Sequence, residues 1–197
     1  MPPLEPKPLV SIHIGEYHAS HLPVVICTTL GSCVAACLYD PVARAGGMNH
    51  ILLPGAADLT RFDEGARYGI NAMELLLNAL MKQGARRPRL NAKIFGGAHL
   101  LPAISVERGP GRRNAEFVEA FLEQEGIPVV AKDLGGFDSR KIYFHTDTAE
   151  VLLKRTPSAA NVRVAALEQK TRRRIRRSAP HSGGVTLFRP GGKDLKR

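Results

Sequence analysis

The sequence predicts an α+β fold: a single domain with mixed or antiparallel β-sheets flanked by helices, followed by a basic C-terminal tail. Segments with the alternation or the β-branched content typical of strands outnumber segments with helical periodicity. Few of them follow the strand–helix–strand order that builds parallel sheets. The 197 residues also suffice for one core of ordinary size without a metal or disulfide.

Four strand segments are expected before the first helix. Residues 9–15 alternate apolar and polar side chains, and residues 24–30 are rich in β-branched side chains and stop at Gly31. Residues 33–39 and 48–54 are separated by a turn that contains an Asp-Pro pair and a Gly-Gly pair. These last two segments should therefore pair as neighbouring strands.

Two segments have the spacing of amphipathic helices. Residues 68–83 place apolar side chains on one face and end before Gly84, and residues 114–125 do the same and end at Gly126. The remaining ordered segments are expected to be strands, at residues 90–95, 127–131, 141–145 and 150–154.

The positive charge is concentrated at one end of the chain. The net charge is +10, but residues 154–197 hold 13 Lys and Arg against two Asp and Glu, a net of +11, which leaves −1 for the rest. We therefore expect an ordered domain over residues 1–156 and a basic, mobile extension over residues 157–197, in which residues 159–177 could form a helix. A neutral body argues against a specific nucleic-acid partner, although the tail could attract an acidic one.

No apolar run reaches the roughly 18 residues that a membrane span requires, and the proline-rich start lacks the apolar core of a signal peptide. A cytoplasmic protein without membrane insertion is expected. Three cysteines within eleven residues do not suggest a secreted disulfide framework. They lack CxxC spacing and would need a distant fourth ligand to bind zinc, so neither metal nor cofactor is expected.

The segment Gly31-Ser32-Cys33 is a candidate for nucleophilic chemistry. A glycine before the thiol permits a sharp turn, and His50 lies on the expected neighbouring strand, where an imidazole could take the thiol proton. The competing interpretation is that Cys33 is a small buried apolar residue and His50 a hydrogen-bonded core histidine.

Several motifs occur in one order along the chain. LGSCVAACLYD at residues 30–40 and GGMNHILLP at residues 46–54 resemble the chemoreceptor glutamine deamidase family, CheD. The resemblance extends over about residues 10–155, through KIFGGA, GRRN, EGIP, DLGG and an arginine before an apolar strand, at residues 93–98, 111–114, 125–128, 133–136 and 140.

The resemblance implies an amidohydrolase that converts glutamine side chains of methyl-accepting chemoreceptors to glutamate with release of ammonia. It assigns Cys33 as the nucleophile that forms a thioester and His50 as the base. The family's third catalytic residue is a threonine, and its usual position is occupied here by Cys27. Thr29 is assigned this role because it shares a strand face with Cys27. Thr28 and Cys27 itself remain alternatives.

The resemblance also places a Phe95-Gly96-Gly97 turn near the active site, where it could contact substrate. Backbone N–H groups around Ser32 are the local candidates for stabilising an oxyanion. A CheC-type phosphatase is an expected partner. From a different class, the chain could be a chemotaxis binding or scaffold module that docks on receptors or on that phosphatase with little catalysis.

Overall fold

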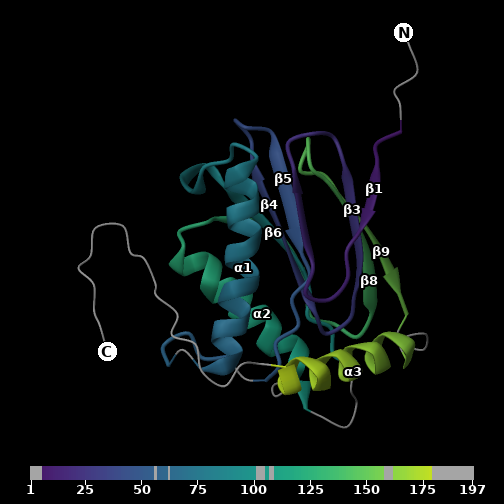
Figure 1. The fold of residues 1–197 in the computed structure, drawn as a ribbon. Coiled ribbons are helices and arrows are strands. Elements are labelled where there is room, and N and C mark those ends of the chain that lie inside the picture. Colours follow the sequence, from purple (N-terminus) through teal and green to yellow (C-terminus); the bar gives the residue numbers. More distant parts are fainter. Residues whose placement is uncertain are drawn as a thin grey trace.

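The computed structural model describes residues 6–55, 57–61, 63–100, 105–106, 109–157 and 162–178. Two sheets lie face to face and two helices cover the outer face of one of them (Figure 1). The first sheet has the order β1 (Leu9–Ser11), β3 (Val25–Leu30), β8 (Ser139–His145) and β9 (Val151–Thr156). The second has the order β2 (Tyr17–Ser20), β5 (Ala45–Asn49), β4 (Val34–Asp40), β6 (Asn91–Gly96) and β7 (Val129–Leu134).

Both sheets are mixed, which confirms the α+β prediction. One parallel pair occurs in each described sheet, β1 with β3 and β6 with β7, and the other pairs are antiparallel. The expected pairing of β4 with β5 is confirmed, with Cys37 opposite Met48. The structure adds β2, a short edge strand beside β5 that the sequence analysis did not predict.

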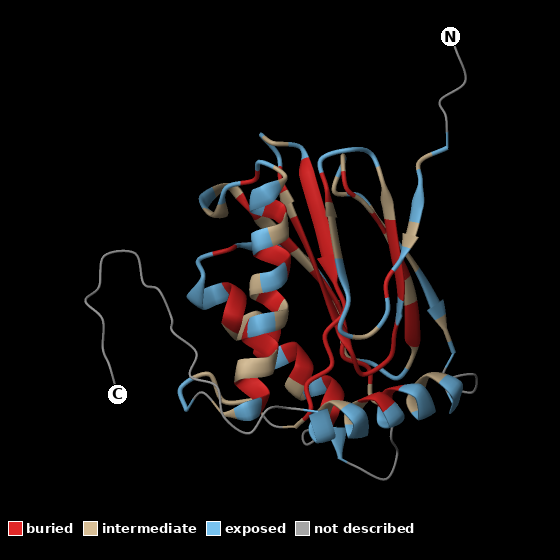
Figure 2. Cartoon of the chain, in the orientation of Figure 1, coloured by how far each residue is buried: buried red, intermediate tan, exposed pale blue. Residues whose placement is uncertain are grey.

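Strand β4 divides the core into two layers. Because side chains alternate along a strand, Val34, Ala36 and Leu38 face the helices, whereas Cys33 and Ala35 face the first sheet. Every residue of β4 except Tyr39 is buried, as the red central strands of Figure 2 illustrate. The inter-sheet layer therefore contains the candidate nucleophile.

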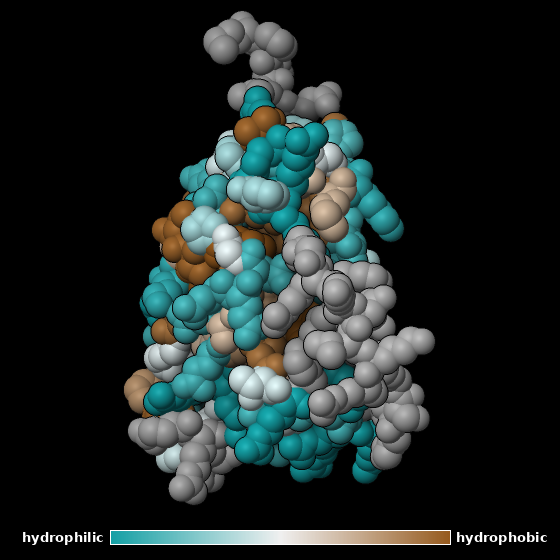
Figure 3. Space-filling model, turned by 90° about the vertical axis from the view of Figure 1, so that its left-hand side faces the viewer, coloured by the Kyte–Doolittle hydropathy of each residue, from teal (hydrophilic) through white to brown (hydrophobic). Residues whose placement is uncertain are grey.

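The two expected helices begin earlier than predicted. Helix α1 (Glu64–Lys82) starts where the Asp63 side chain accepts a hydrogen bond from the Ala66 N–H at 2.8 Å. Helix α2 (Pro110–Gln124) starts with proline at its first position, where a missing N–H costs nothing. Figure 3 shows the side of the molecule on which these helices lie, where the surface is largely hydrophilic with separate apolar patches.

Helix α3 (Val162–Ser178) lies across the ends of the strands, away from α1 and α2 over much of its length (Figure 1). The helix that the sequence allows at residues 159–177 is present as α3. It packs on the domain and buries Glu168 and Thr171, which a mobile extension would not do. Residues 158–161 and 179–197 of that predicted extension lie outside the described residues. Among the described helices, none is long and apolar enough to cross a membrane.

Candidate active site

Cys33 and His50 lie on the same face of one hairpin. Val34 pairs with Ile51 through two backbone hydrogen bonds of 3.0 and 2.8 Å, which places Ala35 opposite His50 in the antiparallel register. Cys33 precedes Ala35 by two residues and so shares its face, diagonal to His50. Both side chains are buried, and the expected approach of the two segments is confirmed.

His50 is oriented by a threonine from the opposite sheet. The Thr28 Oγ1 atom lies 2.7 Å from His50 Nδ1 and donates its single hydrogen to the Ile12 carbonyl at 2.8 Å. Thr28 must therefore accept from His50, which places the imidazole proton on Nδ1. The Nε2 atom is left as a bare acceptor, and it is buried without a hydrogen-bond partner among the described residues.

Thr28, rather than the expected Thr29, contacts the histidine. Alternation along β3 does place these two side chains on opposite faces, as expected. However, the face that packs against the second sheet is that of Ile26, Thr28 and Leu30, and Thr29 is exposed. Cys27 shares the face of Thr29, so we replace Thr29 by Thr28 in the candidate site.

The loop between β3 and β4 presents three backbone donors to one carboxylate. The N–H groups of Gly31 and Cys33 donate to Glu168 Oε1 at 3.1 and 3.2 Å. The Ser32 N–H donates to Oε2 at 3.1 Å, and the Ser32 hydroxyl donates to the same oxygen at 2.5 Å. Convergent N–H groups of this kind bind anionic oxygens.

Gly31 leaves the space that this contact requires. A Cβ atom at Gly31 would lie 2.8 Å from the Glu168 Oε1 atom and 2.9 Å from a methyl group of Val164. The glycine before the thiol therefore allows a carboxylate to reach the loop closely.

The loop is held in place from behind by α2 and β6. Asn114 donates from Nδ2 to the Ser32 carbonyl at 2.6 Å and accepts from the Leu53 N–H at 3.1 Å, so it ties the loop to the end of the hairpin. The Gly97 N–H donates to the Cys33 carbonyl at 2.7 Å. Asn114 was not predicted as a site residue, although it closes the GRRN motif and its position on the buried face of a helix is visible in the sequence.

The expected substrate-contacting residues divide into two groups. Ser32 offers its N–H and hydroxyl to the bound carboxylate, as described above. Phe95 is buried in the layer between the sheets, and Gly96 has a φ of 120° with a Cβ position 2.1 Å from the Cys33 carbonyl oxygen. The Phe95-Gly96-Gly97 turn therefore supports the nucleophile loop, which is residues 31–33 with the candidate nucleophile Cys33, by close backbone approach.

Burial keeps both reactive groups neutral. Burial lowers the pKa of His50 to about 3, with a smaller contribution from His13. Burial also raises the pKa of the Cys33 thiol well above its ordinary value, and the charge of Glu168 and a hydrogen bond to it raise it further, while Arg172 opposes them. The thiol and the imidazole therefore share one buried strand face, and both are uncharged while Glu168 occupies the loop.

The buried neutral histidine predicts a loss of stability in acid. In the unfolded chain His50 becomes protonated below about pH 6.5, its ordinary pKa. In the folded chain it stays neutral down to about pH 3. The free energy of unfolding should therefore fall by up to ~1.4 kcal/mol per pH unit inside this window. Urea unfolding at several pH values measures this change in the free energy of unfolding.

His50→Gln provides the control for this prediction, because an amide does not titrate. Its unfolding free energy should change less between pH 6.5 and pH 5 than that of the unsubstituted protein. Equal slopes for the two proteins would contradict the assignment. The lowered pKa of Asp40 also makes the free energy of unfolding depend on pH, but only below its ordinary value of 3.8. That is outside the interval from pH 5 to pH 6.5 in which the two proteins are compared.

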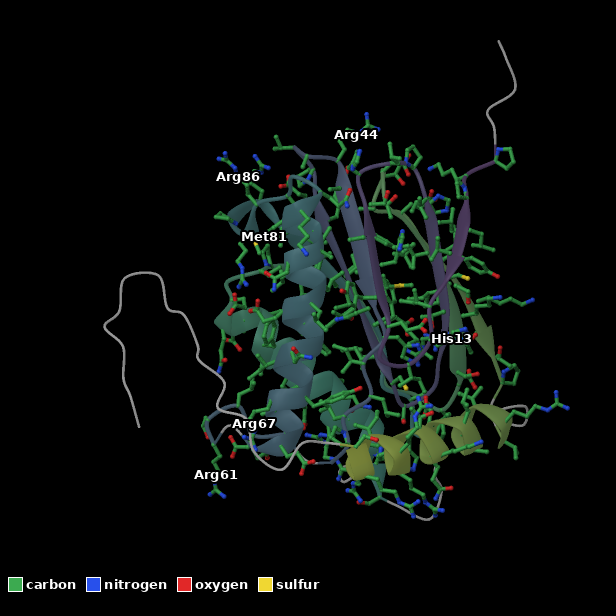
Figure 4. All side chains as sticks on the ribbon, viewed as in Figure 1. His13, Arg44, Arg61, Arg67, Met81 and Arg86 are labelled. Carbon is green, nitrogen blue, oxygen red and sulfur yellow. The ribbon has the colours of Figure 1, made fainter. Side chains whose placement is uncertain are left out.

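A cleft of about 1170 Å³ leads to the histidine. It is bounded by residues 11–14 and β3 on one side and by α3 on the other, and His50, Thr28 and Glu168 line it. His13, labelled in Figure 4, lies between the strands and α3 and lines the same cleft. The cleft therefore brings His50, Thr28 and Glu168 together on one concave surface.

No metal centre is indicated by the described part of the chain. It contains no group of three or more His, Cys, Asp or Glu side chains that could hold an ion. Cys27, Cys33 and Cys37 are free thiols.

Comparison with known proteins identifies the family. A family model described as CheD chemotactic sensory transduction matches residues 52–155. A protein of Stenotrophomonas maltophilia strain K279a named "Probable chemoreceptor glutamine deamidase CheD" is 52% identical over 163 residues, covering 82% of this chain and 79% of the relative. A CheD 1 protein of Shewanella oneidensis, also named a probable chemoreceptor glutamine deamidase, is 46% identical over 181 residues, covering 91% of this chain and 87% of that protein.

Similarity to solved structures is weaker. The Bacillus licheniformis hypothetical protein YfiH matches with a TM-score of 0.40 and 16% identity over 59% of this chain and 49% of that one, which supports no argument. The alignments with the two sequence relatives, at 52% and 46% identity, cover most of this chain and most of each relative. The chain therefore belongs to the CheD family.

Proposed function

We propose that this protein hydrolyses glutamine side-chain amides of methyl-accepting chemoreceptors to glutamate, with release of ammonia. The names of its relatives support this substrate and reaction. The observation that carries the proposal is the convergence of a bare imidazole nitrogen, a thiol and three backbone donors in one site. These are the base, the nucleophile and the oxyanion donors that amide hydrolysis requires.

In the first half of the reaction, His50 Nε2 takes the proton of the Cys33 thiol and the sulfur attacks the carboxamide carbon. The carbonyl oxygen becomes an oxyanion that accepts hydrogen bonds from the N–H groups of residues 31–33. The protonated imidazole then donates to the nitrogen, the C–N bond breaks, and ammonia leaves behind a thioester.

In the second half, water replaces ammonia. His50 Nε2 accepts a proton from water as the oxygen attacks the thioester carbon, and the same N–H groups bind the second oxyanion. The C–S bond breaks, the thiol regains its proton and a glutamate side chain is released. Throughout, Thr28 holds the Nδ1 proton and keeps Nε2 directed to the reacting atoms.

Incubation with a purified receptor cytoplasmic fragment tests the proposal. Peptide mass spectrometry should find glutamines converted to glutamate with a gain of about 1 Da each, together with free ammonia. A receptor fragment that binds but never changes mass would instead support the scaffold alternative. The complete burial of Cys33 is the observation that favours that alternative.

Removal of the Thr28 hydroxyl should slow the reaction while its neighbour tolerates the same change. In Thr28→Val, the imidazole loses the acceptor that fixes its tautomer, so we expect kcat to fall about 10- to 100-fold. Thr29→Val is the matched control, since its side chain is exposed on the other face. Steady-state ammonia release compares them, and equal rates would remove Thr28 from the site.

Three expectations stay predictions. A CheC-type phosphatase as partner, a cytoplasmic location and the absence of a specific nucleic-acid partner each require an experiment of their own.

A further inference from the structure

Helix α3 inserts an acidic side chain into the candidate oxyanion site. Residues 154–197 contain only two acidic residues, and one of them, Glu168, is 4% exposed with both carboxylate oxygens bound to the nucleophile loop. The charge of this carboxylate raises the pKa of the nearby Cys33 thiol. The group that contacts the thiol and the three N–H donors is therefore supplied by the chain itself.

Other residues on the same face of α3, spaced one helical turn apart, also contact the surface around Cys33. Arg172, four residues after Glu168, reaches the Ser32 hydroxyl and the Leu53 carbonyl, each at 3.4 Å. Arg176, one turn further, donates to the Pro54 carbonyl. Val164, one turn before Glu168, packs over Gly31. Four successive turns of a helix thus fit the surface around the nucleophile.

The occupant has the chemistry of the reaction product. Deamidation of glutamine leaves a glutamate side chain whose carboxylate must lie against the thiol and the oxyanion donors. Glu168 has that side chain in that place, and it extends from a helix. A glutamine amide has nearly the same shape, with an NH₂ group in place of one oxygen.

We propose that α3 is an intramolecular product mimic: Glu168 occupies the position of the reactive glutamine, and α3 covers the surface on which a glutamine-bearing helix of the substrate docks. This inference rests on the proposed function, whose site it describes. It makes α3 a competitive inhibitor in cis that must leave before a substrate can enter.

Two further observations support displacement of α3. Cys33 is 0% exposed, so no external side chain can reach it while Glu168 is in place. The helix has little apolar surface to hold it. Its fully buried residues are Glu168 and Thr171, Val164 and Ile175 are half-buried, and Val162 and Leu167 are exposed. A helix attached mainly through polar contacts opens more readily than one with a buried apolar stripe.

Glu168→Gln converts the mimic into a substrate. The Cys33 sulfur should attack the carbon of the introduced amide, release ammonia and, after hydrolysis of the thioester, regenerate Glu168 with a gain of about 1 Da. Mass spectrometry of the peptide that contains residue 168 follows this change over time. Gln169 in the same peptide is exposed and should keep its amide, and Cys33→Ala in the same background should keep both.

Glu168→Ala tests the inhibition. Removal of the carboxylate should lower KM for a receptor fragment about tenfold or more with kcat little changed, because a larger fraction of molecules is open. Alkylation of Cys33 by iodoacetamide should accelerate by a similar factor, while Cys27 and Cys37 serve as internal references. Glu123→Ala, which removes an exposed carboxylate from α2, is the matched control and should change neither value.

The outcomes separate this inference from the proposed function. The product mimic alone would be overturned by a receptor fragment that is deamidated while the amide of Glu168→Gln persists, with KM and Cys33 alkylation unchanged in Glu168→Ala. If neither the receptor nor the Glu168→Gln variant lost its amide, the proposed function would fail and the inference with it. Conversion of the introduced amide that depends on Cys33 would support both.

Discussion

Cys33→Ala is expected to eliminate receptor deamidation, with a fall in kcat/KM of at least about 10⁴-fold, because no other group in the site can form the thioester. The side chain is small and buried, so alanine should be tolerated in the fold. Ammonia release and glutamine mass shifts measure the loss.

Cys37→Ala is the matched control for this variant. Cys37 faces the same layer between the sheets as Cys33 and is also buried. It lies four residues further along the chain, within β4 and outside the nucleophile loop. It should retain activity, and thermal unfolding should show that both variants remain folded. Ammonia release by Cys33→Ala at the rate of the control would exclude the thioester mechanism.

His50→Ala is expected to lower kcat about 10²- to 10⁴-fold, the range that general acid–base groups contribute. The imidazole is needed twice, first for the thiol proton and then for water. Steady-state ammonia release at pH 7 measures the effect, with the fold checked by circular dichroism.

His145→Ala is the control for this substitution, because His145 lies at the end of β8, where its ring approaches Lys7 and not the nucleophile loop. It should keep the full rate. If His50→Ala kept most of the activity instead, another base would be required.

Local pattern was sufficient for the architecture and for the central pair of the site. Alternation and helical spacing depend on near neighbours, so every described strand except the short edge strand β2 could be predicted, as could both core helices, with errors mainly at their ends. The turn between residues 40 and 45 joins β4 and β5 directly, which is why the segments of Cys33 and His50 could be expected side by side.

The choice between Thr28 and Thr29 depended on the packing of two sheets. Alternation assigns the two side chains to opposite faces of β3, but no local pattern tells which face meets the second sheet. That face is set by residues far along the chain, among them Ile142 and Phe144, which pack with Ile26 and Leu30 between the sheets.

The packing of helix α3 on the domain was the least predictable feature, for the same physical reason. Its basic composition and lack of an apolar stripe are typical of a solvated tail, and those features are indeed present. What positions it is a carboxylate bound to backbone N–H groups 135 to 137 residues away in the chain. Backbone donors carry no sequence signature, so composition and periodicity predict the strands and α1 and α2, whereas the occupant of the site is decided only when the folded chain brings its N–H groups together.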